Sequence, residues 1–293
     1  MGLARRANVP PIFVALTIVA LGTSLPELVV SVRAVFEGYP GIVLGNVVGS
    51  NIANILLVAG VGAIIYPLAY PGDSVRRDTA IMILVSIVFT ILCLKNALTP
   101  PIGAALLFGM VLVLVPTLRE VAQSHKESEG QPLPLAVPGL PTQRRFIALF
   151  IILGVIGLPV GARLVVLGTV QIAAGLGVSE AVVGLSIVAF ATSLPELATT
   201  VMAAYRRETE VAIGTVIGSN IFNILVIVGV SVLASPRQIE VPASFPFLDL
   251  PMMLGAALIM VPFVWRRKPL GRITGIALSA TYLAYVVALF TLS

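Results

Sequence analysis

Two short polar blocks, each present twice, carry the residues that could do chemistry in this otherwise apolar sequence. The hexapeptide GTSLPE at 22–27 returns as ATSLPE at 191–196, and GSNIAN at 49–54 returns as GSNIFN at 218–223. Both pairs are offset by 169 residues, and an ungapped alignment around them has 21 identities in 41 positions. Because apolar packing does not require carboxylates, hydroxyls and amides, a duplication that keeps them indicates a binding role.

The polar groups of these blocks are oxygen donors. Glu27 and Glu196 lie inside apolar segments, where burying a charged carboxylate is costly and usually functional. The single histidine, His125, lies in a polar loop, and the single cysteine, Cys93, lies in an apolar run. Carboxylate, hydroxyl, amide and carbonyl oxygens suit Ca²⁺ or Na⁺ rather than zinc, copper or iron. The blocks therefore predict a hard-cation site.

A spacing of four residues places these oxygens on common helix faces. Residues i and i+4 lie one above the other on an α-helix, so their side chains point the same way. The pairs with this spacing are Thr23 and Glu27, Thr192 and Glu196, Ser50 and Asn54, and Ser219 and Asn223.

A proline interrupts each glutamate-bearing segment. Pro26 and Pro195 have no N–H to give to the carbonyls of Gly22 and Ala191, so each segment should break into two half-helices. Such a break is tolerated in a membrane only where protein buries it or where it lines a cavity. Glycines spaced by four, such as Gly41, Gly45 and Gly49, should let a neighbouring helix pack closely against it.

The composition predicts an all-α polytopic membrane protein. Of 293 residues, 58% are hydrophobic and 11% are charged, and the mean hydropathy is +1.07. Soluble domains have about 25% charged residues, and apolar stretches of about 20 residues can span a bilayer. Nine spans are predicted, at roughly 9–36, 41–65, 77–94, 101–118, 146–169, 178–205, 210–234, 247–265 and 272–292.

The basic residues predict the orientation of these spans. With the N-terminus inside, fourteen lysines and arginines face the cytoplasm and three face outside, and the C-terminus lies outside. The net charge of +5 therefore reflects topology and gives no support for nucleic-acid binding. Five spans separate the starts of the two copies, and this odd number predicts an inverted-topology repeat, which is typical of secondary transporters.

The chain then divides into two halves and a linker. Residues 1–120 form the first half with four spans, 121–145 form a cytoplasmic linker, and 146–293 form the second half with five spans. On the 169-residue offset, Met1 aligns with Val170, so the span at 146–169 has no counterpart in the first half. We therefore expect a design of two five-helix halves, ten helices in all, from which the first helix is missing.

The repeated motifs resemble the α-repeats of the cation/Ca²⁺ exchanger superfamily, in its prokaryotic sodium/calcium exchanger branch. The resemblance implies Na⁺-driven Ca²⁺ antiport by alternating access across the cytoplasmic (inner) membrane of a prokaryote. It also implies that Glu27 and Glu196 are the central Ca²⁺ ligands and that Asn54 and Asn223 line the centre. The implied Na⁺ ligands are the hydroxyls of Thr23, Ser24, Thr192, Ser193, Ser50 and Ser219, with the backbone carbonyls of Ala20 and Ala189.

One departure from the family pattern leaves the coupling ion open. Some family members have an aspartate where this chain has Asn223, so the site here holds two formal negative charges, enough to balance one Ca²⁺. Coupling to H⁺ or K⁺ in place of Na⁺ is the main alternative, and a cation channel is a further one. An enzyme is not expected, since no GxGD or HExxH motif occurs. We expect a monomer without a cofactor, with Ca²⁺ and Na⁺ as transported ions and the lipid bilayer as its surroundings.

Overall fold

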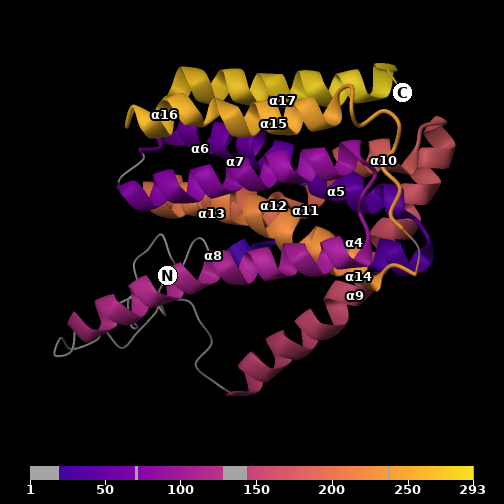
Figure 1. Cartoon of the computed structure of the whole chain (residues 1–293), viewed down its shortest axis with the longest axis horizontal. Coiled ribbons are helices and arrows are strands. Elements are labelled where there is room, and N and C mark those ends of the chain that lie inside the picture. Colours follow the sequence, from indigo (N-terminus) through magenta and orange to yellow (C-terminus); the bar gives the residue numbers. More distant parts are fainter. Residues whose placement is uncertain (1–19, 70–71, 128–143, 237, 293) are drawn as a thin grey trace.

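The computed structural model describes residues 20–69, 72–127, 144–236 and 238–292, which form a helical bundle (Figure 1). Within those ranges, the only β pairing is an isolated antiparallel bridge between Leu68 and Leu270. The first-half elements, with η marking π-helical segments, are α3 (Ala20–Thr23), α4 (Leu25–Glu37), α5 (Pro40–Ala53), η2 (Asn54–Ala59), α6 (Gly60–Ile65), α7 (Asp73–Leu94) and α8 (Pro100–Glu127). Those of the second half are α9 (Arg144–Leu176), α10 (Glu180–Val183), η3 (Gly184–Val188), α11 (Ala189–Thr192), α12 (Leu194–Tyr205), α13 (Thr209–Phe222), η4 (Asn223–Val228), α14 (Gly229–Ala234), α15 (Asp249–Ile259), α16 (Val261–Trp265) and α17 (Arg272–Leu292).

Helices occupy each of the nine predicted segments, although residues 9–19 of the first segment lie outside the described ranges. Among the described residues, four helices are long and apolar enough to span a bilayer, and one bent pair of helices qualifies as a fifth span. Three shorter apolar helices lie in further predicted spans. The fold is therefore that of an all-α membrane protein, and the count of nine crossings remains a prediction.

The predicted linker is shorter than expected at its first end. Helix α8 continues to Glu127, so the prediction of a loop is wrong for residues 121–127. These residues follow Leu118, Arg119 and Glu120 and include Ala122 and Gln123, which are good helix formers, and the first glycine comes only at position 130. Residues 128–143 of the predicted linker lie outside the described ranges.

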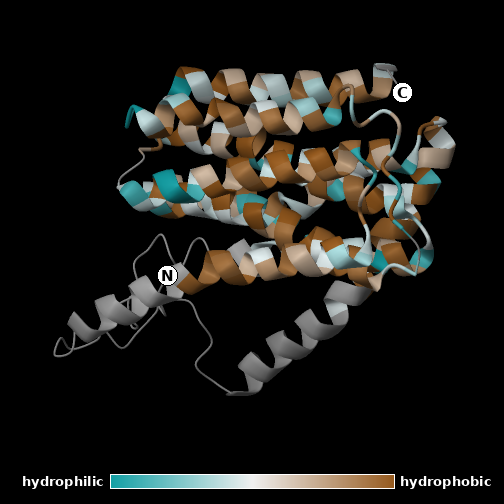
Figure 2. Ribbon diagram, in the orientation of Figure 1, coloured by the Kyte–Doolittle hydropathy of each residue, from teal (hydrophilic) through white to brown (hydrophobic). Residues whose placement is uncertain are grey.

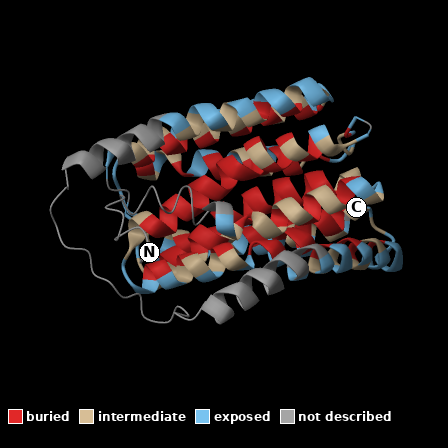
Figure 3. Cartoon of the chain, turned by 90° about the horizontal axis from the view of Figure 1, so that it is seen from below, coloured by how far each residue is buried: buried red, intermediate tan, exposed pale blue. Residues whose placement is uncertain are grey.

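Two long helical segments form the centre of the bundle. In the segments Pro40–Ile65 and Thr209–Ala234, 78% and 83% of the most apolar stretch is buried, against 33% in Asp73–Leu94 and 28% in Arg272–Thr291. Figure 3 shows the central helices as almost continuously buried and the outer ones as exposed on one side. Polar residues on the two central segments are therefore shielded by other helices.

The outer surface of the bundle is apolar. Large side chains such as Phe108, Leu112, Leu164, Leu283 and Val287 are more than half exposed. Figure 2 shows hydrophobic colours along the helix bodies and hydrophilic colours gathered near the helix ends. An apolar belt with polar ends is what a bilayer requires of a membrane protein.

The element boundaries recur at the offset of the sequence repeat. Helix α3 ends at Thr23 and α11 ends at Thr192, 169 residues later, and the starts of α4, α5, η2 and α6 recur in the same way as those of α12, α13, η4 and α14. The duplicated sequence therefore folds twice into the same succession of elements.

A close helix contact brings the two copies together. Helix α5 packs against α10, η3 and α11 of the second copy. A Cβ atom at Gly45 would lie 2.6 Å from the carbonyl oxygen of Ala181, and one at Gly49 would lie 2.7 Å from the Cβ of Ala189. The predicted role of these glycines in close packing is confirmed, because no side chain fits at either position.

Candidate cation-binding site

The two glutamates lie just after a break in their helices. Ser24 separates α3 from α4, and Ser193 separates α11 from α12. In the second copy, the segment ending at Thr192 and the helix beginning at Leu194 differ in direction by 43°. The predicted interruption is confirmed, but it comes two residues before each proline. The prolines instead occupy the first turn of the following helix, where the missing N–H costs nothing.

Glu196 is completely buried and accepts hydrogen bonds from both copies of the repeat. Ser24 of the first copy donates to Oε1 of Glu196 at 3.0 Å, and Ser219 of the second copy donates to the same oxygen at 3.2 Å. Both serines are also fully buried. Residues far apart in sequence thus converge on one carboxylate, and its other oxygen, Oε2, has no hydrogen-bond partner.

Glu27 is also completely buried, and neither of its carboxylate oxygens has a hydrogen-bond partner. Its backbone carbonyl accepts from Nδ2 of Asn46 at 3.2 Å, and the same nitrogen donates to Ser31 at 3.1 Å. The hydroxyl of Thr192 donates to Oδ1 of Asn46 at 3.0 Å. Asn46 therefore links the first glutamate helix to the break in the second copy.

The central asparagines form two crossed pairs between the copies. Nδ2 of Asn54 donates to Oδ1 of Asn220, and Nδ2 of Asn223 donates to Oδ1 of Asn51, both at 3.1 Å. All four are buried, and Asn54 and Asn223 are the first residues of the π-helical segments η2 and η4. A π-helical turn is rare and occurs often at functional sites.

Several buried oxygens around the glutamates accept no hydrogen bond. A buried polar atom without a partner costs about 1–3 kcal/mol, so this cluster is expensive unless a positive ligand satisfies it. The donor set of carboxylate and amide oxygens suits a hard cation. The unpartnered acceptors are Oε1 and Oε2 of Glu27, Oε2 of Glu196, and Oδ1 of Asn54 and Asn223, and the hydroxyls of Ser50 and Ser193 are also buried without partners.

No basic side chain pairs with either glutamate in the described part of the chain. Arg33 instead lies 2.6 Å from Glu37, one turn along its own helix. The described residues also contain no group of three His, Cys, Asp or Glu side chains that could hold a metal. Glu27 and Glu196 are therefore the only charged side chains of the site in the described part of the chain, and its other oxygens are neutral. The other ion pairs described join Asp73 to Arg76 and Arg267, and Asp78 to Arg77.

The remaining predicted ligands lie at the helix breaks. Thr23 ends α3 and is partly buried, and Ala20 is the first residue of that helix that the structure describes. Ala189 begins α11, and its carbonyl accepts the backbone N–H of Ser193 at 3.0 Å. The Thr192 hydroxyl, which donates to Asn46 at 3.0 Å, lies 3.4 Å from the same carbonyl. The Ala189 carbonyl therefore accepts a hydrogen bond from its own chain at the helix break.

Sequence reasoning missed three asparagines of this network. Asn51 and Asn220 lie inside the repeated blocks themselves, so the duplication was a usable signal for them. Asn46 gave no such signal, because its counterpart at the repeat offset is Thr215, whose hydroxyl bonds to Val211 of its own helix. Only the fold brings Asn46 to Thr192.

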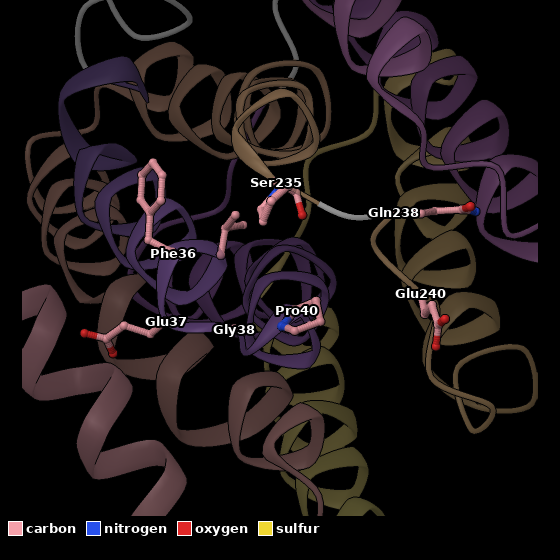
Figure 4. A pocket seen from close by; sticks show the side chains of 9 residues that line it. Phe36, Glu37, Gly38, Pro40, Ser235, Gln238 and Glu240 are labelled. Atoms are coloured by element: carbon pink, nitrogen blue, oxygen red, sulfur yellow. The ribbon is translucent and has the colours of Figure 1, made fainter.

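A separate cavity of about 580 Å³ lies where α4 ends and α5 begins (Figure 4). It is lined from α4 and α5 by Glu37 and Pro40 and from the segment after α14 by Ser235, Gln238 and Glu240. None of the predicted cation ligands lines it. Since Glu37 is already paired with Arg33, the buried glutamates remain the better candidate for cation binding.

The fold and the site define a helical membrane protein built on a duplicated broken-helix module. A family model described as sodium/calcium exchanger protein matches residues 2–118 and 146–291. The chain belongs to the sodium/calcium exchanger family. It is thus an integral membrane transporter of the exchanger or antiporter class.

Individual relatives are similar over nearly the whole chain. Inner membrane protein YrbG of Escherichia coli is 34% identical over 294 residues, covering 99% of this chain and 90% of the relative. Sodium/calcium exchanger MaX1 of Methanosarcina acetivorans is 31% identical, covering 98% of this chain and 91% of that protein. A solved structure of the sodium-calcium exchanger NCX_Mj, soaked with Na⁺ and Sr²⁺, has a TM-score of 0.69 and 30% identity, covering 97% of this chain and 89% of the other.

Proposed function

We propose that the protein exchanges Ca²⁺ for Na⁺ across the cytoplasmic membrane of a prokaryote, at one site formed by Glu27 and Glu196. The observation that carries the proposal is the cluster of buried oxygens without partners on these glutamates and on Asn54 and Asn223. Family membership and the printed names of relatives, among them a sodium/calcium exchanger, support the choice of ions.

The charge of the site explains how the two ions are coupled. Two carboxylates balance one Ca²⁺, and the same oxygens attract Na⁺ when Ca²⁺ leaves. Because both ions need Glu27 and Glu196, neither fills its site while the other is fully bound. Thr23, Ser24, Ser50, Thr192, Ser193 and Ser219, with the carbonyls of Ala20 and Ala189, supply the neutral oxygens for Na⁺.

An inverted repeat gives the bound ion access to both sides of the membrane. With the N-terminus inside and the C-terminus outside, two similar modules of opposite orientation present the same site to either face of the membrane in turn. The copies meet at Ser24 and Glu196, so a movement of one copy against the other changes the site directly. One chain contains both copies, and a monomer is therefore sufficient for alternating access.

Flux measurements in lipid vesicles test the proposal. The purified protein should drive uptake of radioactive calcium when the vesicles are loaded with Na⁺, and Glu27→Gln or Glu196→Gln should abolish it. Glu180→Gln is the matched control, because Glu180 lies at the start of α10, outside the site, and should transport normally. Uptake like that of the wild type in both site variants would refute the assignment.

Because Asn54 and Asn223 carry no charge, a second coupling ion is also considered. The candidate ligands include only two carboxylates, so a small number of monovalent cations neutralises the site. H⁺ or K⁺ can supply that charge in place of Na⁺. Uptake driven by a pH gradient or by internal K⁺ without Na⁺ would favour that alternative. Accelerated exchange by unlabelled Ca²⁺ on the opposite side would distinguish a carrier from a channel.

A further inference from the structure

The orientation of two side-chain amides decides whether the central site is attractive to a cation. Each amide of Asn54 and Asn223 has an oxygen at one end and an N–H donor at the other. In the structure both oxygens are buried without a partner, and both nitrogens donate to the opposite copy. Turning either amide over would remove an oxygen ligand and place a positively polarised N–H near a cation.

The partners of these amides, Asn220 and Asn51, accept through their side-chain oxygens and donate through their nitrogens. Asn220 receives the Asn54 N–H on its oxygen, while its own nitrogen donates to the backbone carbonyl of Asn51 at 3.4 Å and to the sulfur of Met82 at 3.7 Å. A turned Asn220 amide would set its nitrogen against the Asn54 nitrogen and its oxygen against two acceptors. The bonds on both sides of Asn220 therefore agree on one orientation.

The second copy repeats this arrangement with the roles exchanged. Asn51 receives the Asn223 N–H on its oxygen, and its own nitrogen donates to the sulfur of Met253 at 3.9 Å. Asn51 and Asn220 are equivalent at the repeat offset, and both methionines are buried on outer helices, Met82 on α7 and Met253 on α15. A chain of bonds thus runs from each outer helix, through an asparagine of one copy, to the central amide of the other.

We infer that Asn51 and Asn220 are positioning residues that hold the amide oxygens of Asn223 and Asn54 toward the bound cation. They act across the repeat, so each copy orients a ligand of the other. Met82 and Met253 fix the positioning residues by accepting an N–H from each of them, Met82 from Asn220 and Met253 from Asn51. The inference rests on the proposed cation site and adds to it the groups that determine the polarity of its amides.

A double-substitution experiment separates orientation from general damage. Calcium binding is measured by titration calorimetry on the purified full chain in detergent. Asn220→Leu should raise the Ca²⁺ concentration for half-saturation about tenfold or more, because an amide ligand is no longer held. In an Asn54→Asp background both ends of the side chain are oxygen, and one of them faces the Asn220 oxygen. Asn220→Leu then removes no orienting bond, so it should leave Ca²⁺ binding unchanged or tighten it, which is the non-additivity expected of coupled residues.

A structural role for Asn220 gives the opposite pattern. If Asn220→Leu weakened binding by the same factor in both backgrounds, the positioning role would be disproved while the proposed function stood. The proposed function itself would be overturned if the wild type did not bind Ca²⁺, or if Glu27→Gln bound Ca²⁺ as the wild type does. Should Asn220→Leu fail to fold, the symmetric cycle of Asn51→Leu with Asn223→Asp decides the matter by the same criterion.

Matched controls complete the experiment. Thr215→Val removes a buried polar group from α13, the helix that carries Asn220. The Thr215 hydroxyl donates to the carbonyl of Val211 in the same helix at 2.8 Å, so this substitution should not change Ca²⁺ binding. Met82→Leu keeps the volume and removes the sulfur acceptor, so it should weaken binding. Met252→Leu, at a partly buried methionine of α15, should not. Equal effects of the two methionine substitutions would count against the inference.

Discussion

The hydroxyl of Ser24 donates to Oε1 of Glu196 at 3.0 Å, although the two residues lie 172 positions apart in the chain. Ser24 occupies the break between α3 and α4, and Glu196 lies in the first turn of α12, after the equivalent break. The break in one copy therefore supports the carboxylate of the other. This crossing of the copies recurs in the asparagine pairs and is the main organising relationship of the site.

Removing the Ser24 hydroxyl should weaken Ca²⁺ transport. A hydrogen bond to a charged group contributes about 1.5–3 kcal/mol, so Ser24→Ala should raise the Ca²⁺ concentration for half-maximal uptake by about tenfold or more. The measurement is initial uptake into vesicles across a range of Ca²⁺ concentrations. Ser86→Ala is the control, because the buried Ser86 hydroxyl bonds only to Met82 of its own helix at 2.8 Å, and its half-maximal concentration should stay at the wild-type value.

Bound Ca²⁺ should stabilise the protein, and a chelator should remove the effect. A ligand present at 100 times its dissociation constant stabilises the folded state by about 2.7 kcal/mol. The thermal unfolding midpoint in detergent should therefore rise with added Ca²⁺ in the wild type and not in Glu27→Gln. A rise of equal size in both proteins would mean that Ca²⁺ binds elsewhere.

A methyl group at Gly45 should disrupt the contact between the two copies. In Gly45→Ala, the new Cβ would lie 2.6 Å from the carbonyl oxygen of Ala181, and such overpacking costs about 1–3 kcal/mol. Thermal unfolding should show a lower midpoint. Gly255→Ala, within α15, meets no atom within 4 Å and should stabilise the helix slightly, since alanine is the better helix former. Equal destabilisation by both changes would contradict the packing argument.

Two neighbouring tyrosines of α17 should respond differently to the loss of their hydroxyls. Tyr285 donates to Oδ1 of Asp249 at 2.9 Å, and both side chains are buried. Tyr285→Phe should destabilise the protein by about 1–3 kcal/mol, because it leaves a buried carboxylate without this donor.

Tyr282→Phe provides the comparison. Its hydroxyl is buried without a partner, so removing it should leave the unfolding midpoint unchanged or raise it. Both midpoints are read from the same thermal scans, and a larger loss in Tyr282→Phe than in Tyr285→Phe would contradict the assignment of this bond.

The sequence by itself determined the helical membrane class, the repeat, and the positions of the helix breaks to within two residues. Apolar stretches long enough for a bilayer, and prolines without an N–H, act through local chemistry that is readable from neighbouring residues. Glu27 and Glu196 stood out for the same reason, since a carboxylate in an apolar segment needs an explanation.

Only the tertiary structure decided which oxygens accept hydrogen bonds and which remain free. Ser24 reaches Glu196, Asn46 reaches Thr192, and Asn54 reaches Asn220, and each of these contacts spans more than 140 residues. The same polar residue types at the same spacing are compatible with several pairings, and the close approach of α5 to the second copy at Gly45 and Gly49 selects one of them. The repeat in the sequence identified most residues of the candidate site, whereas the packing of one copy against the other determined the partner of each. Hydrogen bonds depend on distances in space, and the spacing of residues along the chain does not specify those distances.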